Sequence, residues 1–350
     1  MKIRTLTRRA AGLVPLGAVA VLLTALALPA SAAATPPVLR LGGVDRIDTA
    51  IKISQDYVPN VGAAQGAAQS VVLARSDSFP DALAGVPLAV AKAGPLLLTP
   101  PGSLDPRVLT EIQRVLAPGA TVYLMGGEGA LSAAVATGVT QAGYVTQRFA
   151  GTDRFDTALK VAQEIVGTPT GTGTDIGLVV VTTGTDFPDA LAAGAYAGTF
   201  GGAVVLTAGP LLPKAVADYL TVRKADSAIV AVGGPAAKAA QGYYGASIVG
   251  TNRYDTAAKL AAEFVDTQDA TFPTYAGVAS GVTFPDALAG GAELGALGGP
   301  LLLTNPTALS PEASTYLTAK ANKPIQQYMI FGGTGAVGTG VEAALNKMFP

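Results

Sequence analysis

The chain has 350 residues, of which 49% are hydrophobic, and it carries 23 basic against 24 acidic side chains. It contains neither histidine nor cysteine, which excludes catalytic triads built on these residues, histidine-ligated zinc and stabilising disulfides. The balanced charge also excludes the basic footprint of a nucleic-acid-binding protein.

The first 34 residues have the pattern of a secretory signal peptide followed by a short linker. A basic start precedes an apolar run that reaches Leu28, and Ala30-Ser31-Ala32 is a small-residue cleavage pattern. An uncleaved membrane anchor is the alternative that the length of the run leaves open. Cleavage near Ala33 predicts a secreted protein without a membrane contact, whose 19 basic and 24 acidic residues give a net charge of −5.

Beyond this segment, short apolar runs alternate with segments of helical character. Pro80 suits the first turn of a helix, where its missing N–H costs nothing, and Pro87 predicts a bend in that helix. Strands are expected at 70–75, 95–99, 121–127 and 145–151, and helices after Pro80 and at 107–117, 132–143 and 153–166. This alternation predicts a parallel sheet covered on both faces, as in α/β proteins of the flavodoxin or Rossmann type.

Three sequence markers recur in the same order three times. The first is Phe-Pro-Asp-Ala-Leu-Ala, with its phenylalanine at Phe79, Phe187 and Phe284. The second is "GGVDRIDTA" at 42–50, "AGTDRFDTA" at 150–158 and "VGTNRYDTA" at 249–257, and the third is an apolar run closed by Gly-Gly. Recurrence at about 100 residues indicates tandem domains. We therefore predict three repeats, at 35–146, 147–245 and 246–350.

Residues 190–213 form a long uncharged stretch that resembles a membrane span. The matching segments of the other repeats carry Pro87, Lys92 and Glu293, and equivalent positions should share one environment. We therefore expect a buried helix and strand in this stretch.

The recurring motifs fall in loops that lead from a strand into a helix. Such loops emerge at the carboxyl edge of a parallel sheet, which predicts that Asp81, Asp189 and Asp286 occupy equivalent places at helix starts on that edge. The arginine loops should lie close to them, across the junctions between neighbouring repeats.

The aspartates of these loops raise two catalytic alternatives. A pair of carboxylates could act as a glycosidase dyad, and oxygen ligands could hold a hard metal ion. Three copies of a catalytic pair are not needed, and the third copy has Asn252 in place of one acid. An arginine inside each cluster would repel a cation. We expect neither a metal nor a cofactor, and no enzymatic activity.

Arg46, Arg154 and Arg253 are open to two interpretations. Structurally, each would pair with the aspartate of a Phe-Pro-Asp loop, while Asp48, Asp156 and Asp255 would cap or open a helix. Functionally, the arginines and exposed helix N-termini would form anion pockets. Both interpretations hold together if an aspartate orients each arginine.

The markers together resemble the type-two cell-wall-binding repeat of Gram-positive surface proteins. The matching residues in the first repeat are "GVDRIDTAIKIS", "LARSDSFPDALAG", "GPLLLT" and "VYLMGGEGALS". The resemblance implies three α/β domains about a pseudo-threefold axis, and non-covalent attachment to an anionic cell-wall polysaccharide or a teichoic-acid-like polymer. It implies a location at the cell surface.

The resemblance also implies polymer binding near the Pro-Leu-Leu strand. The candidate binding residues are therefore the three arginines, Asp81, Asp189 and Asp286, together with Pro95, Leu96, Leu97, Pro300, Leu301 and Leu302. The second repeat departs from this pattern, because "GAVVLT" fills that slot, and we expect it to bind least well. Two other functions stay open: a self-assembling envelope or surface-layer protein, and a cryptic carbohydrate-active enzyme.

Overall fold

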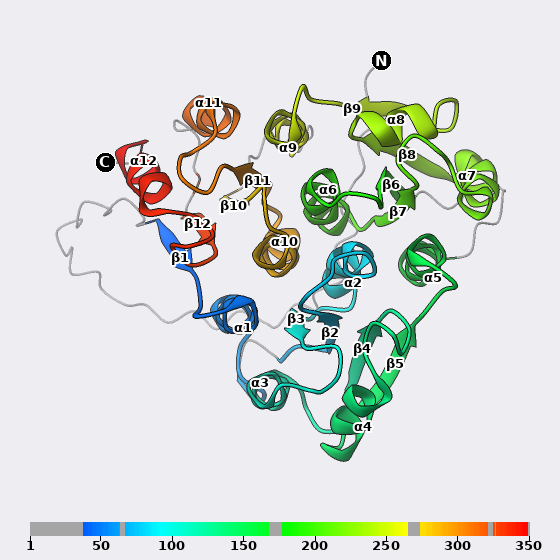
Figure 1. Ribbon diagram of the computed structural model, residues 1–350, viewed down its shortest axis with the longest axis vertical. Coiled ribbons are helices and arrows are strands. Elements are labelled where there is room, and N and C mark those ends of the chain that lie inside the picture. The colour runs from blue at the N-terminus through cyan, green and yellow to red at the C-terminus, as the bar shows by residue number, and fades with distance from the viewer. Residues whose placement is uncertain are drawn as a thin grey trace, which may run out of the picture.

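The computed structural model describes residues 38–63, 67–167, 177–264, 274–320, 325 and 327–348. The predicted signal peptide lies outside the described residues. Three four-stranded parallel sheets surround a central bundle of three helices, and Figure 1 looks along the axis of this arrangement. The predicted fold, three parallel-sheet α/β units about a pseudo-threefold axis, is confirmed.

The strands of the three sheets follow one topology. The orders are β3-β2-β4-β5, β7-β6-β8-β9 and β1-β12-β10-β11. The strands are β1 (Leu39–Leu41), β2 (Ser70–Arg75), β3 (Leu96–Thr99), β4 (Thr121–Met125), β5 (Val145–Phe149), β6 (Gly177–Thr183), β7 (Ala203–Thr207), β8 (Ser227–Val232), β9 (Ala246–Ile248), β10 (Tyr275–Ser280), β11 (Leu301–Thr304) and β12 (Gln327–Phe331). The central strands are apolar on both faces because helices cover both.

The helices alternate with the strands, as the sequence predicts. They are α1 (Arg46–Tyr57), η1 (Ala82–Ala84, a 3₁₀ turn), α2 (Gly85–Ala91), α3 (Pro106–Val115), α4 (Ala133–Gln141), α5 (Arg154–Val166), α6 (Pro188–Thr199), α7 (Lys214–Asp226), α8 (Gly234–Ala239), α9 (Arg253–Ala262), α10 (Pro285–Leu297), α11 (Pro311–Lys320) and α12 (Thr339–Met348). The bend expected at Pro87 appears as the change from η1 to α2, since proline cannot donate to the carbonyl four residues earlier.

The stretch 190–213 is a buried helix and strand, as expected, formed by most of α6 and by β7. Among the described residues, no helix has the length and apolar character needed to cross a lipid bilayer.

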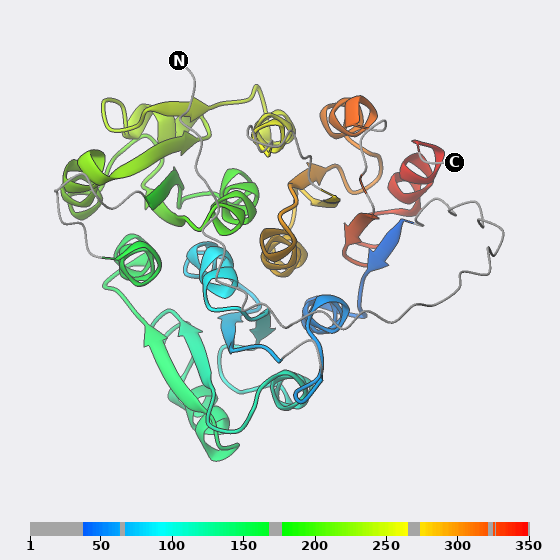
Figure 2. The same ribbon diagram turned by 180° about the vertical axis from the view of Figure 1, so that it is seen from behind.

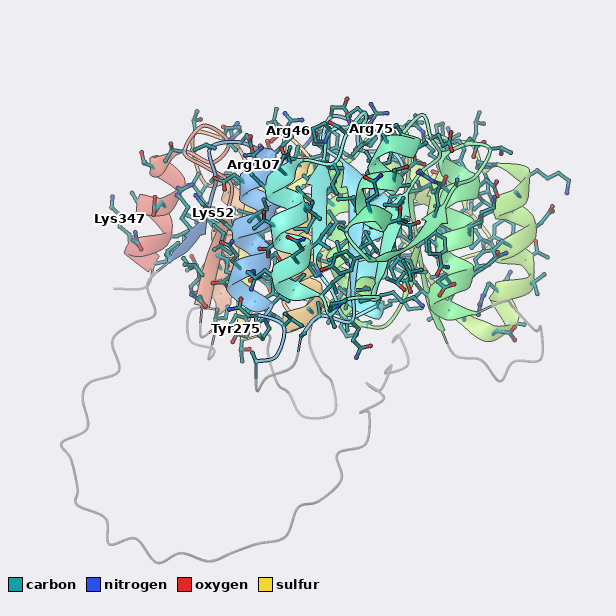
Figure 3. The ribbon with its side chains drawn as sticks, turned by 90° about the horizontal axis from the view of Figure 1, so that it is seen from below. Arg46, Lys52, Arg75, Arg107, Tyr275 and Lys347 are labelled. Atoms are coloured by element: carbon teal, nitrogen blue, oxygen red, sulfur yellow. The ribbon has the colours of Figure 1, made fainter. Side chains whose placement is uncertain are left out.

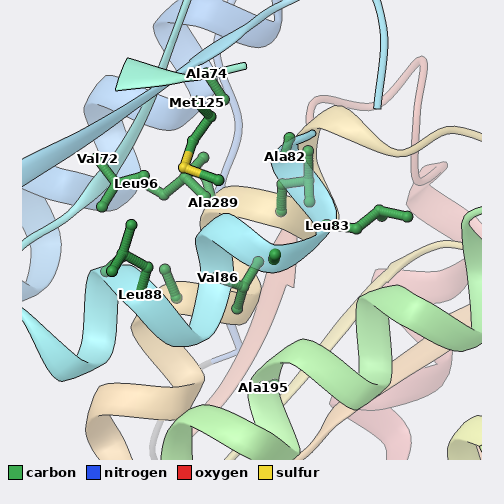
Figure 4. Packing of buried hydrophobic residues seen from close by; sticks show 14 of the residues in the cluster. Val72, Ala74, Ala82, Leu83, Val86, Leu88, Leu96, Met125, Ala195 and Ala289 are labelled. Carbon is green, nitrogen blue, oxygen red and sulfur yellow. The ribbon is translucent and has the colours of Figure 1, made fainter. Parts of the chain in front are cut away.

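The three central helices α2, α6 and α10 pack closely along the axis because small residues face their neighbours. A Cβ added at Gly194 of α6 would lie 2.9 Å from the Cβ of Val86, and one added at Gly198 would lie 2.8 Å from Cγ2 of Val90. Figure 4 shows Val86 and Leu88 on α2 among these buried contacts. Glycine at these positions therefore sets the distance between the helices, and with it the geometry of the ring.

The ring is closed by the two ends of the described chain. Strand β1 pairs with β12. Nη1 of Arg40 in β1 also donates a hydrogen bond to the carbonyl of Gly332, which lies 292 residues later in the chain. Arg40 also forms an ion pair with Glu342 of α12 at 3.0 Å. Figure 2 shows β1 beside β12 from behind. The third sheet is thus completed by residues from the start of the first repeat.

The spatial units are therefore offset from the sequence repeats by one strand. Strand β5 stays in the sheet of β2 to β4, and a boundary between residues 146 and 147 falls inside it. The helix after each arginine motif packs on the next sheet: α1 on β3, α5 on β7 and α9 on β11. We call α1 to β5 the first unit, α5 to β9 the second unit, and α9 to β12 with β1 the third unit.

Candidate functional site

The recurring motifs meet at one edge of the molecule, where the strands end. Figure 3 places Arg46, Arg75 and Arg107 along this edge and Tyr275, the first residue of β10, at the opposite edge. At each of three junctions, the Phe-Pro-Asp turn of one unit lies next to the arginine loop that begins the next. The three aspartates occupy equivalent places at helix starts, as predicted: Asp81 before η1, and Asp189 and Asp286 in the first turns of α6 and α10.

The residue before each arginine caps the helix that follows. The side chains of Asp45, Asp153 and Asn252 accept hydrogen bonds from the amides of Asp48, Asp156 and Asp255 at 2.8 to 2.9 Å. Such caps stabilise a helix by about 0.5–2 kcal/mol. Asp48, Asp156 and Asp255 lie in the first turns of these helices, as predicted for residues that open a helix, but they are not the caps. Their carboxylates accept instead from the amides of Val44, Thr152 and Thr251, and this contact fixes the loop entering the helix.

Each arginine fastens the Phe-Pro-Asp loop of its own unit. Nη1 of Arg46 donates to the Ser76 carbonyl at 2.7 Å, and Arg154 and Arg253 donate to the equivalent carbonyls of Gly184 and Gly281 at 2.7 and 2.6 Å. These bonds use one nitrogen of each guanidinium. The structural role expected of the arginines is thus present, but it is directed at a backbone carbonyl.

The aspartates reach across the junctions. The carboxylate of Asp286 in the third unit lies beside the Thr49 side chain of α1 and near Arg46. Burial raises the pKa of Asp286 to about 6 and outweighs these two contacts, which lower it. Burial likewise raises the pKa of Asp189, whose carboxylate lies beside the Thr256 side chain and near Arg253. Asp81 and Thr157 line one cleft at the third such junction.

The Gly-Gly marker provides space for these aspartates. The first glycine of each pair, Gly126, Gly233 and Gly332, has a φ of 88°, 90° and 119°. A Cβ there would lie 2.1 to 2.6 Å from an oxygen of the neighbouring aspartate. Both the backbone conformation and the close approach therefore require glycine.

The three phenylalanines converge on the axis. The ring centroids of Phe79, Phe187 and Phe284 are 5.4, 5.8 and 5.9 Å apart, which is within the range of favourable aromatic pairs. The Arg154 guanidinium lies 6.0 Å from the centre of the Phe79 ring. The three copies of the Phe-Pro-Asp motif thus build one aromatic cluster and three equivalent junctions.

The Pro-Leu-Leu segments are buried inside the protein. The side chains of Leu96, Leu97, Leu301 and Leu302 are at most 1% exposed in β3 and β11, and Pro95 and Pro300 are also buried. Although β3 and β11 are edge strands of their sheets, the side chains of these residues are covered and offer no exposed surface to a polymer. Direct contact of the polymer with these six residues stays a prediction, and their burial argues against it.

Sequence reasoning missed the threonine of each Asp-Thr-Ala motif. The hydroxyls of Thr49, Thr157 and Thr256 accept hydrogen bonds from the amides of Gly43, Gly151 and Gly250. A Cβ at Gly43 or Gly151 would lie within 2.4 Å of the threonine amide. The recurring G-x-x-R-x-D-T pattern was the available signal, because glycine six residues before an invariant threonine indicates a close backbone approach.

The chain matches one family model in three segments. The model is described as cell wall binding domain 2 (CWB2), and it covers residues 40–136, 148–241 and 247–342. N-acetylmuramoyl-L-alanine amidase LytC of Bacillus subtilis (strain 168) is 28% identical over 322 residues, which make up 91% of this chain and 60% of the amidase. The chain thus spans less than two thirds of this relative.

Two solved structures share the fold. Cwp8 from Clostridium difficile matches with a TM-score of 0.73 and 25% identity over 89% of this chain and 51% of its own. Cwp6 from the same organism matches with a TM-score of 0.74 and 21% identity over 91% of this chain and 50% of its own. The likeness to Cwp6 concerns the fold alone.

Proposed function

The chain belongs to the cell wall binding domain 2 family, and we propose that it is a non-catalytic module that attaches non-covalently to an anionic secondary polymer of a Gram-positive cell wall. Membership of this family indicates cell-wall binding and a place at the wall or cell surface. We further propose that the protein is secreted and loses its signal peptide. N-terminal sequencing of the secreted protein should then give a start near Ala33.

The observation that carries the proposal is the threefold repetition of the arginine junction on one edge. Arg46 is exposed, and the side chain of Arg253 is 37% exposed. Each arginine commits Nη1 to a loop carbonyl, and Nη2 of Arg253 also lies 3.7 Å from the Asp186 carboxylate. The donors outside these contacts can bind an anionic group. A structural bond and a binding contact can therefore use the same side chain.

Charge supports short-range recognition over long-range attraction. A mature chain with a net charge of −5 does not draw in a polyanion from a distance. One exposed arginine in water binds an anion weakly. Three sites held rigidly about one axis can gain about 10²–10⁴-fold in avidity when a single polymer engages them together.

The test is co-sedimentation of the mature protein with walls of defined composition. We expect binding to intact and protein-stripped walls and its loss on walls from which the secondary polymer has been extracted. Binding that survives this extraction would contradict a secondary-polymer ligand. Sedimentation without walls would instead support a self-assembling envelope protein, and release of soluble sugar or peptide from purified walls would support an enzyme.

A further inference from the structure

A polar cleft lies at the carboxyl edge between the first and second units. Its volume is about 340 Å³, which is near the lower end for small-ligand pockets. Its walls come from the loops after β2 and β4 and from the loop that begins α5. The polar lining includes Arg75, Asp81, Asp153 and Arg154, with the backbone of Gly127 and Gly129.

Arg75 distinguishes this cleft from the other two junctions. It is the last residue of β2, and the residues at the same position of β6 and β10 are Thr183 and Ser280. Nε and Nη2 of Arg75 donate to the Asp77 carboxylate at 2.6 and 3.0 Å, and Nη1 donates to the Gly129 carbonyl at 3.3 Å. These bonds hold the guanidinium in one orientation at the cleft, with its side chain 26% exposed.

The charges that line the cleft balance. Two arginines face two aspartates in the lining, and Asp77 outside the lining adds one negative charge beside Arg75. Such a site has no net positive field to concentrate a polyanion. It does place fixed donors beside fixed acceptors, which is the pattern that hydroxyl groups match, since each hydroxyl both donates and accepts.

We propose that this cleft is a subsite for one neutral, hydroxyl-bearing sugar ring of the wall polymer, and that Arg75 is its specificity-determining residue. The inference rests on the proposed wall binding: Arg154 would take the anionic group of the polymer, as Arg46 and Arg253 do at the other two junctions, and the part of the cleft beside Arg75 would take the neutral sugar ring next to it. Arg75 is absent from the equivalent positions of the other junctions, so this recognition belongs to the cleft between the first and second units.

Two variants test the cleft by different means. Arg75→Thr installs the residue that the second unit carries at this position, so the strand should be maintained. Gly129→Gln adds a side chain beside the cleft, where a Cβ meets no atom within 4 Å. The matched controls are Lys214→Gln, which makes the same charge change at an 86% exposed side chain, and Gly335→Gln, in the equivalent loop of the third unit, where a Cβ also meets nothing.

The first measurement is the wall affinity of the mature protein. Loss of a hydrogen bond to a charged group should weaken binding about tenfold in either cleft variant, and the controls should stay within about twofold of wild type. If wild type fails to bind walls, the proposed function falls and this inference with it. If wild type binds and both cleft variants bind equally well, the inference alone is overturned.

The second measurement is saturation-transfer NMR with glucose and with glucuronate, two probes that differ by one carboxylate. We expect transfer to glucose that is lost in Arg75→Thr and Gly129→Gln and retained in both controls. Glucose transfer that both cleft variants keep, or transfer to glucuronate alone, would overturn a neutral-sugar subsite.

Discussion

The first and third units share every recurring motif, yet they differ in the residues around these motifs. Nine residues after the phenylalanine, the first unit has Leu88 and the third has Glu293, both fully buried on central helices. The helix cap is Asp45 in one and Asn252 in the other. The motifs thus tolerate different neighbours, and a compensating change accompanies one of these two differences.

The helix caps show how this works. Asp45 receives hydrogen bonds from Arg107, the second residue of α3, at 3.0 and 3.3 Å. The second residue of α11 is Glu312, and there Asn252 donates to the Glu312 carboxylate at 2.8 Å. An aspartate at position 252 would face another carboxylate. The departure in the third repeat is therefore a compensated exchange, and the cap itself is unchanged.

Glu293 has no such compensation among the described residues. Neither carboxylate oxygen has a hydrogen-bond partner there, and the buried hydroxyl of the nearby Tyr57 also lacks one. Burial raises the pKa of Glu293 well above its usual value, and the neighbouring Asp56 raises it further. The third unit thus carries an internal polar group where the first carries a well-packed leucine.

The largest effect should come from removing the arginines of both units. Arg46→Gln or Arg253→Gln alone should weaken wall binding modestly, because two junctions remain. The double variant should lose about 10²–10⁴-fold by co-sedimentation, since multivalent engagement is lost.

The matched control for this double variant is Lys214→Gln with Lys347→Gln, which makes the same charge change at exposed positions. Thermal melting should first establish that each variant is folded. A folded double variant that binds like wild type would show the arginines to be structural. If it unfolds, Arg46→Lys with Arg253→Lys can be tested, because it retains the charge but not the planar fork.

Replacing Leu88 of the first unit by glutamate, the residue at the equivalent position of the third unit, should strongly destabilise the fold. Leu88→Glu would bury a carboxyl group among apolar side chains, at a cost of about 3–5 kcal/mol in the free energy of unfolding. Chemical denaturation measures this change, and Leu88→Met, of similar volume, is the control. A loss below 1 kcal/mol would show that this position tolerates charge as its counterpart does.

The reverse exchange should stabilise the protein. Glu293→Leu removes a buried group without a described partner and should add about 1–3 kcal/mol to the free energy of unfolding at pH 7. Because folding raises the pKa of Glu293, its stabilising contribution is complete below the usual value of 4.5 and is lost as the pH rises through the folded-state pKa.

The gain from Glu293→Leu should therefore be larger at pH 8 than at pH 4.5, as denaturation at both values would show. The raised pKa of Asp286, about 6, also makes the free energy of unfolding fall between about pH 4 and 6. This loss is the same in wild type and in Glu293→Leu. An equal gain at both pH values would mean that Glu293 does not titrate differently in the folded chain.

The smallest effect concerns the helix caps. Asn252→Asp would set two carboxylates against each other and should cost about 1 kcal/mol, reduced by solvent at this exposed position. Adding Glu312→Arg reproduces the pairing of the first unit and should recover the loss. A double-mutant cycle by thermal denaturation measures the coupling, and its absence would mean that the two caps are independent of their partners.

Much of the fold follows from local sequence patterns. Apolar runs of strand length and the start signals at Pro80, Pro188 and Pro285 predict parallel α/β units, and strand-to-helix loops of such units must share an edge. The positions of Asp81, Asp189 and Asp286 follow from this rule alone. The Pro-Leu-Leu candidates show a limit of sequence patterns, because an apolar strand and an apolar binding surface look alike in sequence, and only burial separates them.

The sequence by itself determined the three repeats, their α/β class, the edge on which the motifs gather and the absence of histidine and cysteine chemistry. These properties depend on composition, spacing and local periodicity. The tertiary structure decided that β1 completes the third sheet, that each aspartate meets the threonine of the next unit, and that Arg75 faces a cleft between two units. Such contacts join residues far apart in the chain, and their geometry is set by the close packing of α2, α6 and α10, which no local pattern encodes.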